Sequence, residues 1–339
     1  MKPVICFYKN DQYIYSDDYT LLSANENVFE FLADIERKYS AVMKIVQVDF
    51  EVTKASVFIL NAFEIVNSDY LNTTEKVEIE FKPYISKNDF IQKVIQIKKD
   101  ICAGRYYQVN FTSKFSSQTE EDSFSLFKKY FRLFKSRYSA FLPMQTQQKS
   151  FEILCYSPEL FLEKIGLQIK TEPIKGTLNT DLKQLIASPK EIAELSMIVD
   201  LLRNDLNSVC TKPVQVTKHR EILDLGYTQH TYSEIRGETQ MTLPEILKQT
   251  YPGGSISGCP KTESLKAISE LETESRGFYT GSIGWWQNSD FKLNIAIRSF
   301  KKQNTKIEYF AGCGIVFDSD PESEWQEFLT KAGRLSVNL

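Results

Sequence analysis

The sequence predicts an α+β fold with a largely antiparallel sheet, and three observations lead to it. Segments dense in aromatic and β-branched residues, which favour strands, follow one another in consecutive runs. Segments with apolar residues at helical spacing stand between those runs, so strand and helix do not alternate one by one as in a parallel sheet. The chain has 339 residues, 42% of them hydrophobic, which allows one large or two ordinary domains with ample core.

The first half of the chain opens with strands. Residues 1 to about 85 are strand-rich, and their composition predicts strands at Val4–Phe7, Lys44–Val52 and Ser56–Ile65. A helix is predicted over Asn88–Gly104, because its apolar residues recur at helical spacing. The elements that follow are a strand at Tyr107–Phe115, a helix at Phe124–Phe134 and a strand-rich stretch at Ile153–Ile174.

The second half mixes helices with further strands. The segments with helical spacing are Pro189–Asn204, Leu243–Thr250, Lys261–Glu272 and Pro321–Leu335. The segments with strand-like composition are Phe278–Trp286, Phe291–Phe300 and Ile307–Phe317.

Composition narrows the class of protein. A net charge of -3 gives no basic field, so we expect neither nucleic acid nor a membrane surface as a partner. No stretch approaches the roughly 20 apolar residues that span a bilayer, and the apolar run after Met1 is too short for a signal peptide. The six cysteines are never closer than 49 residues, which excludes short-spaced zinc patterns and suggests no disulfide framework. We therefore expect a cytoplasmic protein with reduced thiols.

A lysine in a turn is the first candidate for chemistry. Lys175 lies between Pro173 and Gly176, just after a predicted strand, where partial desolvation would favour its neutral, nucleophilic amine. Glu159 stands sixteen residues earlier, at the start of an apolar strand. A nucleophilic amine with a proton-donating carboxyl group is a recurrent catalytic pair. Taken alone, the five residues of the turn favour the alternative, a surface lysine.

Two acidic helix faces suggest a metal site. Glu191 and Glu194 lie three residues apart on one predicted helix, and Glu324 and Glu327 do so on another, with Lys331 on the same stripe. Brought face to face, these carboxylates would form an oxygen-rich site for Mg²⁺. Glu191 also fits a capping box that begins at Ser188, so Glu194 ranks above it as a ligand. Solvated helix surface is the alternative for each glutamate.

Three further residues complete the candidates. Gly314 interrupts a predicted strand, which indicates either close backbone approach to a ligand or a β-bulge. Arg298 ends an apolar strand and suits a carboxylate clamp or a structural salt bridge. His230 is one of two histidines, and a satisfied core histidine is the alternative to a catalytic role. The glycine-rich segment 251–261 lacks P-loop spacing, so nucleotide binding is not expected.

These segments belong to a series of motifs in fixed order. The series comprises SPE from Ser157, PIKGT from Pro173, ExxExxMIVDLLRND from Glu191, QHxxS from Gln229, PGGSISGxPK from Pro252, RGxYxGxxGW from Arg276, IRS from Ile297 and AGxGIVxDSDPExExxE from Ala311. In this order the chain resembles the chorismate-utilising enzymes, which include anthranilate synthase component I, aminodeoxychorismate synthase component I, and the isochorismate and salicylate synthases. The resemblance runs from about Asn88 to the end of the chain.

The resemblance implies a fold and a domain division. Antiparallel sheets should pack as a sandwich with helices on the outside, and the chorismate pocket should lie between the sheets. Residues 86–339 should form the chorismate-binding catalytic domain, and residues 1–85 an abbreviated, strand-rich N-terminal part of the same fold. Because larger relatives hold a tryptophan pocket in a longer N-terminal lobe, we expect no inhibition by tryptophan.

Two positions sort the subfamilies. Relatives that add water to chorismate have a lysine general base where this chain has Gln108, and glutamine cannot deprotonate water. Anthranilate synthases usually read PIAGT, with alanine at the position of Lys175. The resemblance therefore implies an aminodeoxychorismate synthase component I, with anthranilate synthase component I as the alternative.

The resemblance also implies roles for the candidates. Lys175 would attack C2 of chorismate while Glu159 protonates the departing C4 hydroxyl, with His230 in support. Mg²⁺, held by Glu194 and Glu327 with Glu191 and Glu324 close by, would bind the ring carboxylate. The remaining contacts to the two carboxylates of chorismate would come from Gly176, Thr177, Lys331, Arg298, Gly314 and Trp285. A separate glutamine amidotransferase subunit would supply the ammonia.

Overall fold

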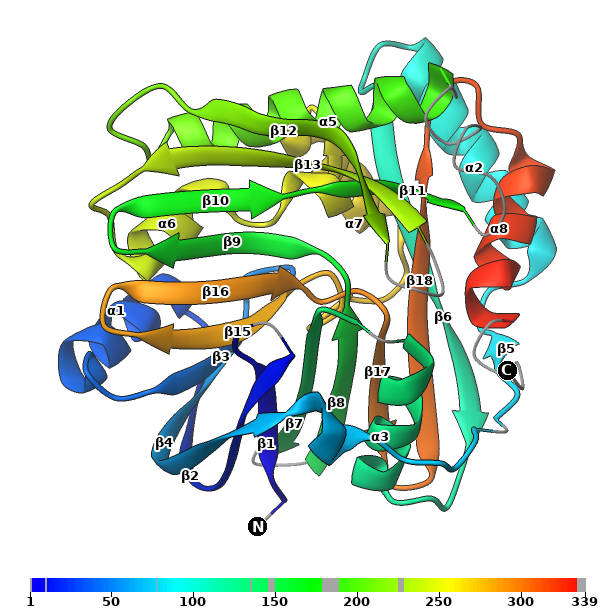
Figure 1. Cartoon of the computed structure of the whole chain (residues 1–339). Coiled ribbons are helices and arrows are strands. Elements are labelled where there is room, and N and C mark those ends of the chain that lie inside the picture. Colours follow the sequence, from blue (N-terminus) through cyan, green and yellow to red (C-terminus); the bar gives the residue numbers. More distant parts are fainter. Residues whose placement is uncertain are drawn as a thin grey trace.

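A computed structural model describes residues 2–9, 11–77, 79–134, 136–145, 150–178, 189–224 and 229–333. Within these ranges, the side chains of 176–178, 189–191, 193, 224 and 333 are outside the description. Eighteen strands in the described residues join into one hydrogen-bonded sheet, and all their pairings are antiparallel. Helices lie outside the strands (Figure 1). The predicted α+β fold is confirmed.

Strands of the N-terminal quarter pair with strands from the rest of the chain. It contains β1 (Val4–Phe7), β2 (Gln12–Ala24), α1 (Val28–Tyr39), β3 (Lys44–Val48) and β4 (Ala55–Asn67). Strand β1 pairs with β7 (Tyr138–Gln145), and β3 pairs with β15 (Ser282–Gln287). The hydrogen-bonded sheet thus runs across residue 85. The domain division predicted there stays a prediction.

One set of strands runs nearly vertically in Figure 1. It contains β6 (Gln108–Gln118), β8 (Ser150–Ser157), β17 (Ser299–Gln303) and β18 (Lys306–Ile315), with the short β5 (Lys82–Pro83) at one edge. Strands β6 and β18 pair without interruption from Gln118 opposite Lys306 to Val109 opposite Ile315. Helices α2 (Lys87–Cys102), α3 (Ser123–Phe134) and α8 (Pro321–Gly333) lie beside this set (Figure 1).

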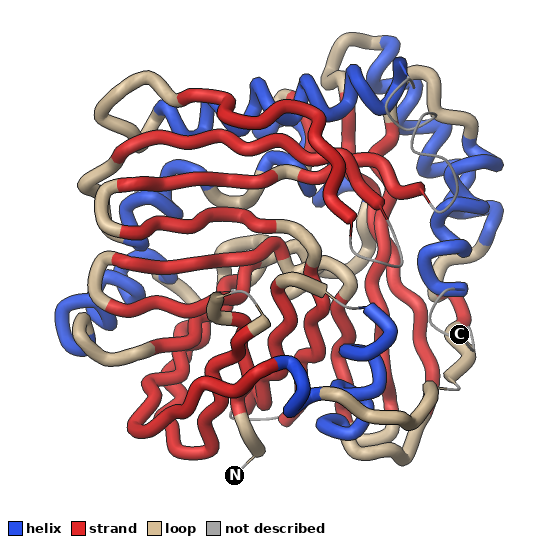
Figure 2. The backbone as a smooth tube through the Cα atoms, viewed as in Figure 1, coloured by secondary structure: helices blue, strands red, loops and turns tan. Residues whose placement is uncertain are grey.

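A second set crosses the first at a steep angle, as Figure 2 shows. It contains β9 (Leu160–Ile165), β10 (Gln168–Glu172), β11 (Ile174–Leu178), β12 (Gln215–Asp224), β13 (Gln229–Glu238), β15 and β16 (Asp290–Ile295). Helices α5 (Pro189–Asn207), α6 (Leu243–Thr250) and α7 (Lys261–Leu271) cover one side of it (Figure 1). The second set joins the N-terminal strands where β15 pairs with β3, so residues distant in sequence converge there.

Aromatic rings fix α8 on the first set. Phe328 of α8 stacks on Phe115 of β6 at 4.4 Å and on Phe90 of α2 at 5.1 Å between ring centroids. All three side chains are buried. Burial of such rings contributes several kcal/mol, and their offset contacts add about 1 kcal/mol each. The polar face of α8 is therefore held in a defined position.

Most predicted elements are present, and three differences have physical reasons. The predicted strand Phe291–Phe300 is two strands, β16 and β17, because the chain turns at Arg298 with φ 50. Strand β15 begins only at Ser282, since Gly277 and Thr280 also have positive φ. Helix α1 was not predicted, although Val28, Leu32 and Ile35 form its buried face. None of the described helices is long and apolar enough to cross a membrane.

Candidate active site

The structure brings Lys175 and Glu159 together beside the loop 251–260. Lys175 lies on β11 opposite Thr231 of β13, whose hydroxyl donates to the Lys175 carbonyl at 3.0 Å. Lys175 Nζ donates to the backbone carbonyl of Ser255 at 3.4 Å. Strand pairing thus fixes the backbone of Lys175 and directs its half-buried side chain toward the loop.

Glu159 is a buried acid that faces this lysine. The residue is 4% exposed, and its backbone N–H donates to Ser157 Oγ at 3.1 Å. Burial raises the pKa of Glu159 to about 7, against the opposing effects of the Ser255 side chain, the Lys175 charge and the Ile174 backbone. A carboxylic acid with this pKa is substantially protonated at neutral pH, so it can donate a proton to a leaving group.

Arg298 and His230 form a second pair. The turn between β16 and β17 places Arg298 Nη2 at 3.0 Å from Nε2 of His230, which is 2% exposed. Because a guanidinium only donates, Nε2 of His230 is the acceptor in this hydrogen bond. Arg298 adopts a left-handed backbone conformation, which costs about 1 kcal/mol or more in a residue other than glycine. The pair offers a fixed guanidinium that suits a carboxylate.

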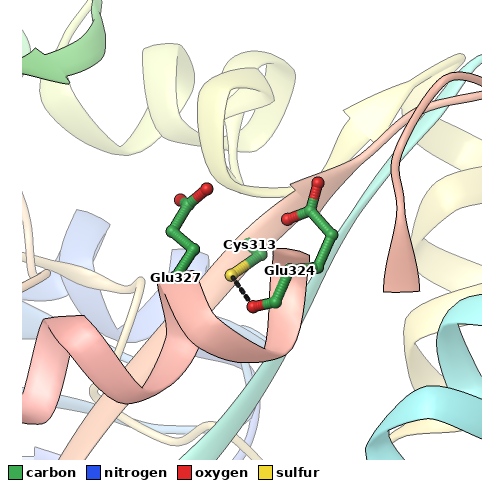
Figure 3. Close-up of side chains that lie close together, drawn as sticks. All are labelled: Cys313, Glu324 and Glu327. Atoms are coloured by element: carbon green, nitrogen blue, oxygen red, sulfur yellow. Dashed lines mark hydrogen bonds between the residues drawn. The ribbon is translucent and has the colours of Figure 1, made fainter. Parts of the chain in front are cut away.

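Glu324 and Glu327 gather with Cys313 in an acidic cluster (Figure 3). One ligand atom from each residue lies within 4.8 Å of the others. Glu324 is 4% exposed and accepts a hydrogen bond from Ser319 Oγ at 2.7 Å, whereas Glu327 is exposed. The carboxylate oxygens suit Mg²⁺, which binds through one or two carboxylates and keeps several waters, while the thiol is not a ligand it prefers.

Lys331 lies beside this cluster and forms an ion pair with one of its glutamates. Its Nζ lies 2.8 Å from Glu327 Oε1 and donates to the Gly312 carbonyl at 2.5 Å. Desolvation acts to lower the pKa of Lys331, but Cys313 and Glu327 outweigh it and raise the pKa above the usual value of a lysine. Lys331 is therefore a cation next to the acidic side chains, as a carboxylate-binding group needs to be.

Tyr279 is a residue that the sequence analysis missed. It is 4% exposed and stacks on Phe310 at 5.1 Å between ring centroids. Burial raises the pKa of its phenol, and the positive charges of Arg276 and Lys331 act against that rise. Tyr279 thus lies close enough to Lys331 for the positive charge to affect the pKa of the phenol. Its place in the RGxYxGxxGW motif was the available signal.

Trp285 was predicted as a substrate contact, and that role stays a prediction. It is on β15 between Ile45 of β3 and Lys292 of β16, and its ring contacts Tyr8 at 5.3 Å. The indole is 4% exposed, and its Nε1 has no hydrogen-bond partner among the described residues. Of the contacts described here, none joins Trp285 to another candidate.

Gly314 lies where β18 meets β6. It pairs with Asn110, and a Cβ added to Gly314 would come within 2.5 Å of Gln108 Nε2. Gln108 itself is 1% exposed, and its Oε1 lacks a hydrogen-bond partner within the described part of the chain. Glycine at position 314 therefore leaves room for the buried amide, which explains the interrupted strand without a bulge.

The remaining predicted residues lie on α5 and β11. Glu194 is half-buried on α5 and is not part of the acidic cluster found among the described residues. The backbone of Glu191 belongs to α5, and that of Gly176 and Thr177 to β11, but their side chains lie outside the description. Their predicted roles in binding metal and substrate stay predictions.

Comparison with known sequences decides the family. The sequence profile described as "chorismate binding enzyme" matches residues 5–336, nearly the whole chain. The chain belongs to this family. The match begins well before Asn88, so the family pattern includes the N-terminal strands.

Curated members of the family with similar sequences have two different names. Aminodeoxychorismate synthase component 1 of Bacillus subtilis is 34% identical over 265 residues, which are 74% of this chain and 56% of that protein. Anthranilate synthase component 1 of Lactococcus lactis is 33% identical over 278 residues, which are 78% and 60% of the two chains. The chain thus spans less than two thirds of the length of these relatives.

Solved structures of the family share the fold. Anthranilate synthase component I of Streptococcus pneumoniae superposes with a TM-score of 0.84 at 23% identity, covering 97% of this chain and 93% of that one. The menaquinone-specific isochorismate synthase of Escherichia coli superposes with a TM-score of 0.81 at 18% identity, covering 99% and 88%. The anthranilate synthase-like architecture expected from the motifs is confirmed.

Proposed function

We propose that this protein aminates chorismate at C4 with ammonia and produces 4-amino-4-deoxychorismate, for para-aminobenzoate and folate synthesis in the cytoplasm. One observation carries the proposal: an amine, Lys175, faces a buried acid, Glu159, that is substantially protonated at neutral pH. The anthranilate synthases that the motifs resemble usually have alanine at the position of Lys175, so a lysine beside the acid favours amination through a covalent adduct.

The two groups would act in sequence. The neutral amine of Lys175 forms a bond to C2, the ring double bonds shift, and the C4–oxygen bond breaks. Glu159 gives its proton to the departing hydroxyl, which leaves as water. Ammonia then forms a bond to C4, the double bonds shift back, and the bond from C2 to Lys175 breaks. The enolpyruvyl group stays on the product.

Charged groups around the pair would hold the two carboxylates of chorismate. Arg298, fixed by His230, would bind the enolpyruvyl carboxylate together with the backbone at Gly314. Lys331 and the backbone of β11 at Gly176 and Thr177 would bind the ring carboxylate. Tyr279 would contribute a phenol beside Lys331.

Mg²⁺ would be held by Glu327 and Glu324 on α8 and by Glu194, with Glu191, on α5. The two carboxylates of the α8 cluster fit this ion, and they support the proposal. When bound, the ion would neutralise the ring carboxylate and stabilise negative charge as the double bonds shift.

The ammonia would come from a separate glutamine amidotransferase subunit. The sequence supports this, because none of its six cysteines lies in a glutaminase-like nucleophile elbow and it has only two histidines. Cys6, Cys155 and Cys313 are also buried. Their raised pKa values, caused chiefly by burial, make them poor nucleophiles.

Anthranilate synthesis is the alternative, because relatives of similar identity have that name. The two functions differ in product. Incubation of the protein with chorismate, Mg²⁺ and an ammonium salt, followed by mass spectrometry, separates them. A product with the mass of aminodeoxychorismate and no release of pyruvate supports the proposal. Anthranilate together with pyruvate overturns it.

A further inference from the structure

Arg276, the first residue of the motif RGxYxGxxGW, is a buried cation outside the residues assigned to the candidate active site. It is 3% exposed and lies in the segment between α7 and β15. Its Nε and Nη2 donate to the two carboxylate oxygens of Glu272, the residue after α7, at 2.8 and 2.6 Å. Such a bidentate ion pair fixes the plane of the guanidinium.

The remaining N–H groups of Arg276 bind two segments of the candidate site. Nη1 donates to the carbonyl of Ile256 in the loop 251–260 at 2.9 Å, and Nη2 donates to the carbonyl of Asn110 on β6 at 2.5 Å. Nη1 also donates to Thr280 Oγ1 at 3.3 Å. Together with the ion pair, these contacts use all five N–H groups of the guanidinium. One side chain therefore connects the loop to β6.

Both carbonyls lie beside residues with proposed roles. The loop carbonyl belongs to the residue that follows Ser255, whose own carbonyl accepts the hydrogen bond from Lys175 Nζ at 3.4 Å. On β6, Asn110 pairs with Gly314 of β18. The N–H of Asn110 also donates to the carbonyl of Ser257 at 2.9 Å. Arg276 thus strengthens the attachment of the loop to β6 close to the amine.

The turn after β3 holds Arg276 in place from the N-terminal quarter. The carboxylate of Glu51 accepts hydrogen bonds from the backbone N–H groups of Arg276 at 2.7 Å and Gly277 at 3.1 Å. The guanidinium lies 4.4 Å from the centroid of the Phe50 ring, which is a cation–π contact. The backbone and the side chain of Arg276 therefore both have defined positions.

We propose that Arg276 is a positioning residue for the amination. Its guanidinium fixes the loop 251–260 on β6, and the loop in turn orients the amine of Lys175. The inference rests on the proposed function for the role of Lys175. The planar fork of five N–H groups binds Glu272 and both carbonyls at once. The ammonium of a lysine at this position is a compact charge with three donors, which keeps the ion pair but cannot reproduce the fork.

Arg276→Lys therefore separates positioning from stability. It keeps a positive charge beside the buried carboxylate of Glu272, which would otherwise be left without compensation. The rate of chorismate consumption with Mg²⁺ and an ammonium salt gives kcat and KM for either product. We expect kcat to fall about tenfold or more while KM for chorismate changes by less than about threefold, since Arg298 and Lys331 are unchanged.

Arg105→Lys is the matched control. Arg105 forms a bidentate ion pair with Glu270 of α7, with two N–O distances of 2.8 Å, and none of its described contacts reaches the loop 251–260. This variant should keep the parent kcat. Hydrogen exchange measured by mass spectrometry should become faster in the loop for Arg276→Lys and stay at the parent rate for Arg105→Lys.

Three results would overturn the inference. They are a kcat of folded Arg276→Lys within about threefold of the parent value, a loss of kcat/KM that comes from KM alone, and a fall in kcat without faster exchange of the loop amides. If Arg276→Lys does not fold, Arg276→Met combined with Glu272→Gln removes both charges and is measured in the same way. Product analysis tests the proposed function separately, because anthranilate would refute that function while the kcat, KM and exchange rates remain interpretable.

Discussion

At the scale of single residues, Glu159 is an acid whose pKa is raised by burial, against the opposing effects of the Ser255 side chain, the Lys175 charge and the Ile174 backbone. Its pKa of about 7 lies above the usual value of 4.5. The folded protein therefore holds this proton more tightly than the unfolded chain does. It follows that Glu159 favours folding most below pH 4.5, and that this contribution is lost as pH rises toward 7.

We expect Glu159→Gln to stabilise the fold at alkaline pH. A neutral amide of the same shape avoids ionisation of a buried group, so its free energy of unfolding at pH 8 should exceed that of the parent by up to about 3 kcal/mol. Near pH 4.5 the two proteins should unfold alike. Urea unfolding at both pH values measures the difference, and an equal difference at both would show that Glu159 does not titrate in the folded state as described.

Lys175→Ala should lose amination by more than about a thousandfold, because it removes the attacking group. Lys175→Arg is the matched variant, since it keeps a positive charge near Glu159 but offers no neutral amine at accessible pH. Both variants should be inactive in mass-spectrometric assay of aminodeoxychorismate. Full activity in either would refute the covalent route.

Sequence reasoning reached the acid and the amine but not the loop residue that accepts a hydrogen bond from the amine. Lys175 and Glu159 stand in short motifs with strand and turn signals, so local chemistry pointed to them. Ser255 lies 80 residues after Lys175, and only the closed fold brings the two into contact. Trp285 and Tyr279 lie in one motif, but only the structure shows that Tyr279 lies near Lys331.

At the scale of elements, the ion pair between Lys261 of α7 and Asp205 of α5 is the contact that mutation can test most directly. The pair is mostly buried, and removal of one partner leaves the other charge without compensation. We expect Lys261→Met to cost about 3 kcal/mol of unfolding free energy. Asp205→Asn combined with Lys261→Met should cost less than the sum of the two single changes.

The control for this cycle lies on the same helix. Lys266 and Glu263 of α7 form an exposed pair with 59% and 37% of their side chains accessible. Such pairs contribute less than about 1 kcal/mol, so Lys266→Met should be nearly neutral. Chemical unfolding of all variants gives the comparison, and equal costs for the two lysines would contradict a stabilising role for the buried pair.

Elements with strong periodicity were predicted to within a few residues. The helix predicted at Leu243–Thr250 has those bounds in the structure, because a capping box at Thr242 and Glu245 starts it. Strands were harder, since β2, β12 and β13 carry mixed polar residues and their pairing partners are far away in sequence. The turn at Arg298 could not be predicted, because a residue with left-handed backbone inside an apolar run leaves no signal in the sequence.

At the scale of the whole molecule, the N-terminal quarter supplies partners for strands of the remainder. Strands β7 and β15 each have an edge paired with β1 or β3. Val4, Ile5, Ile45 and Val46 are at most 1% exposed in that junction. Removal of these strands would expose two open edges and the apolar residues beneath them.

A chain of residues 86–339 should therefore fail to fold as a compact monomer. We expect it to elute as aggregates in size-exclusion chromatography and to bind a dye specific for exposed apolar surface, unlike the full chain. A soluble, compact monomer with a cooperative thermal transition would contradict this expectation. It would show that the segment after residue 85 is an independent domain.

The left-handed backbone at Arg298 lowers the stability of the fold at a residue that has a proposed role in binding. Thr280, which bonds to Ala296 two residues before Arg298, shares the same unfavourable φ region. Glycine at either position would relieve the strain and lengthen the life of the fold under heat. At position 298, however, glycine would also discard the guanidinium that His230 holds. Stability at high temperature and the proposed binding of a carboxylate by Arg298 therefore make opposite demands on this position.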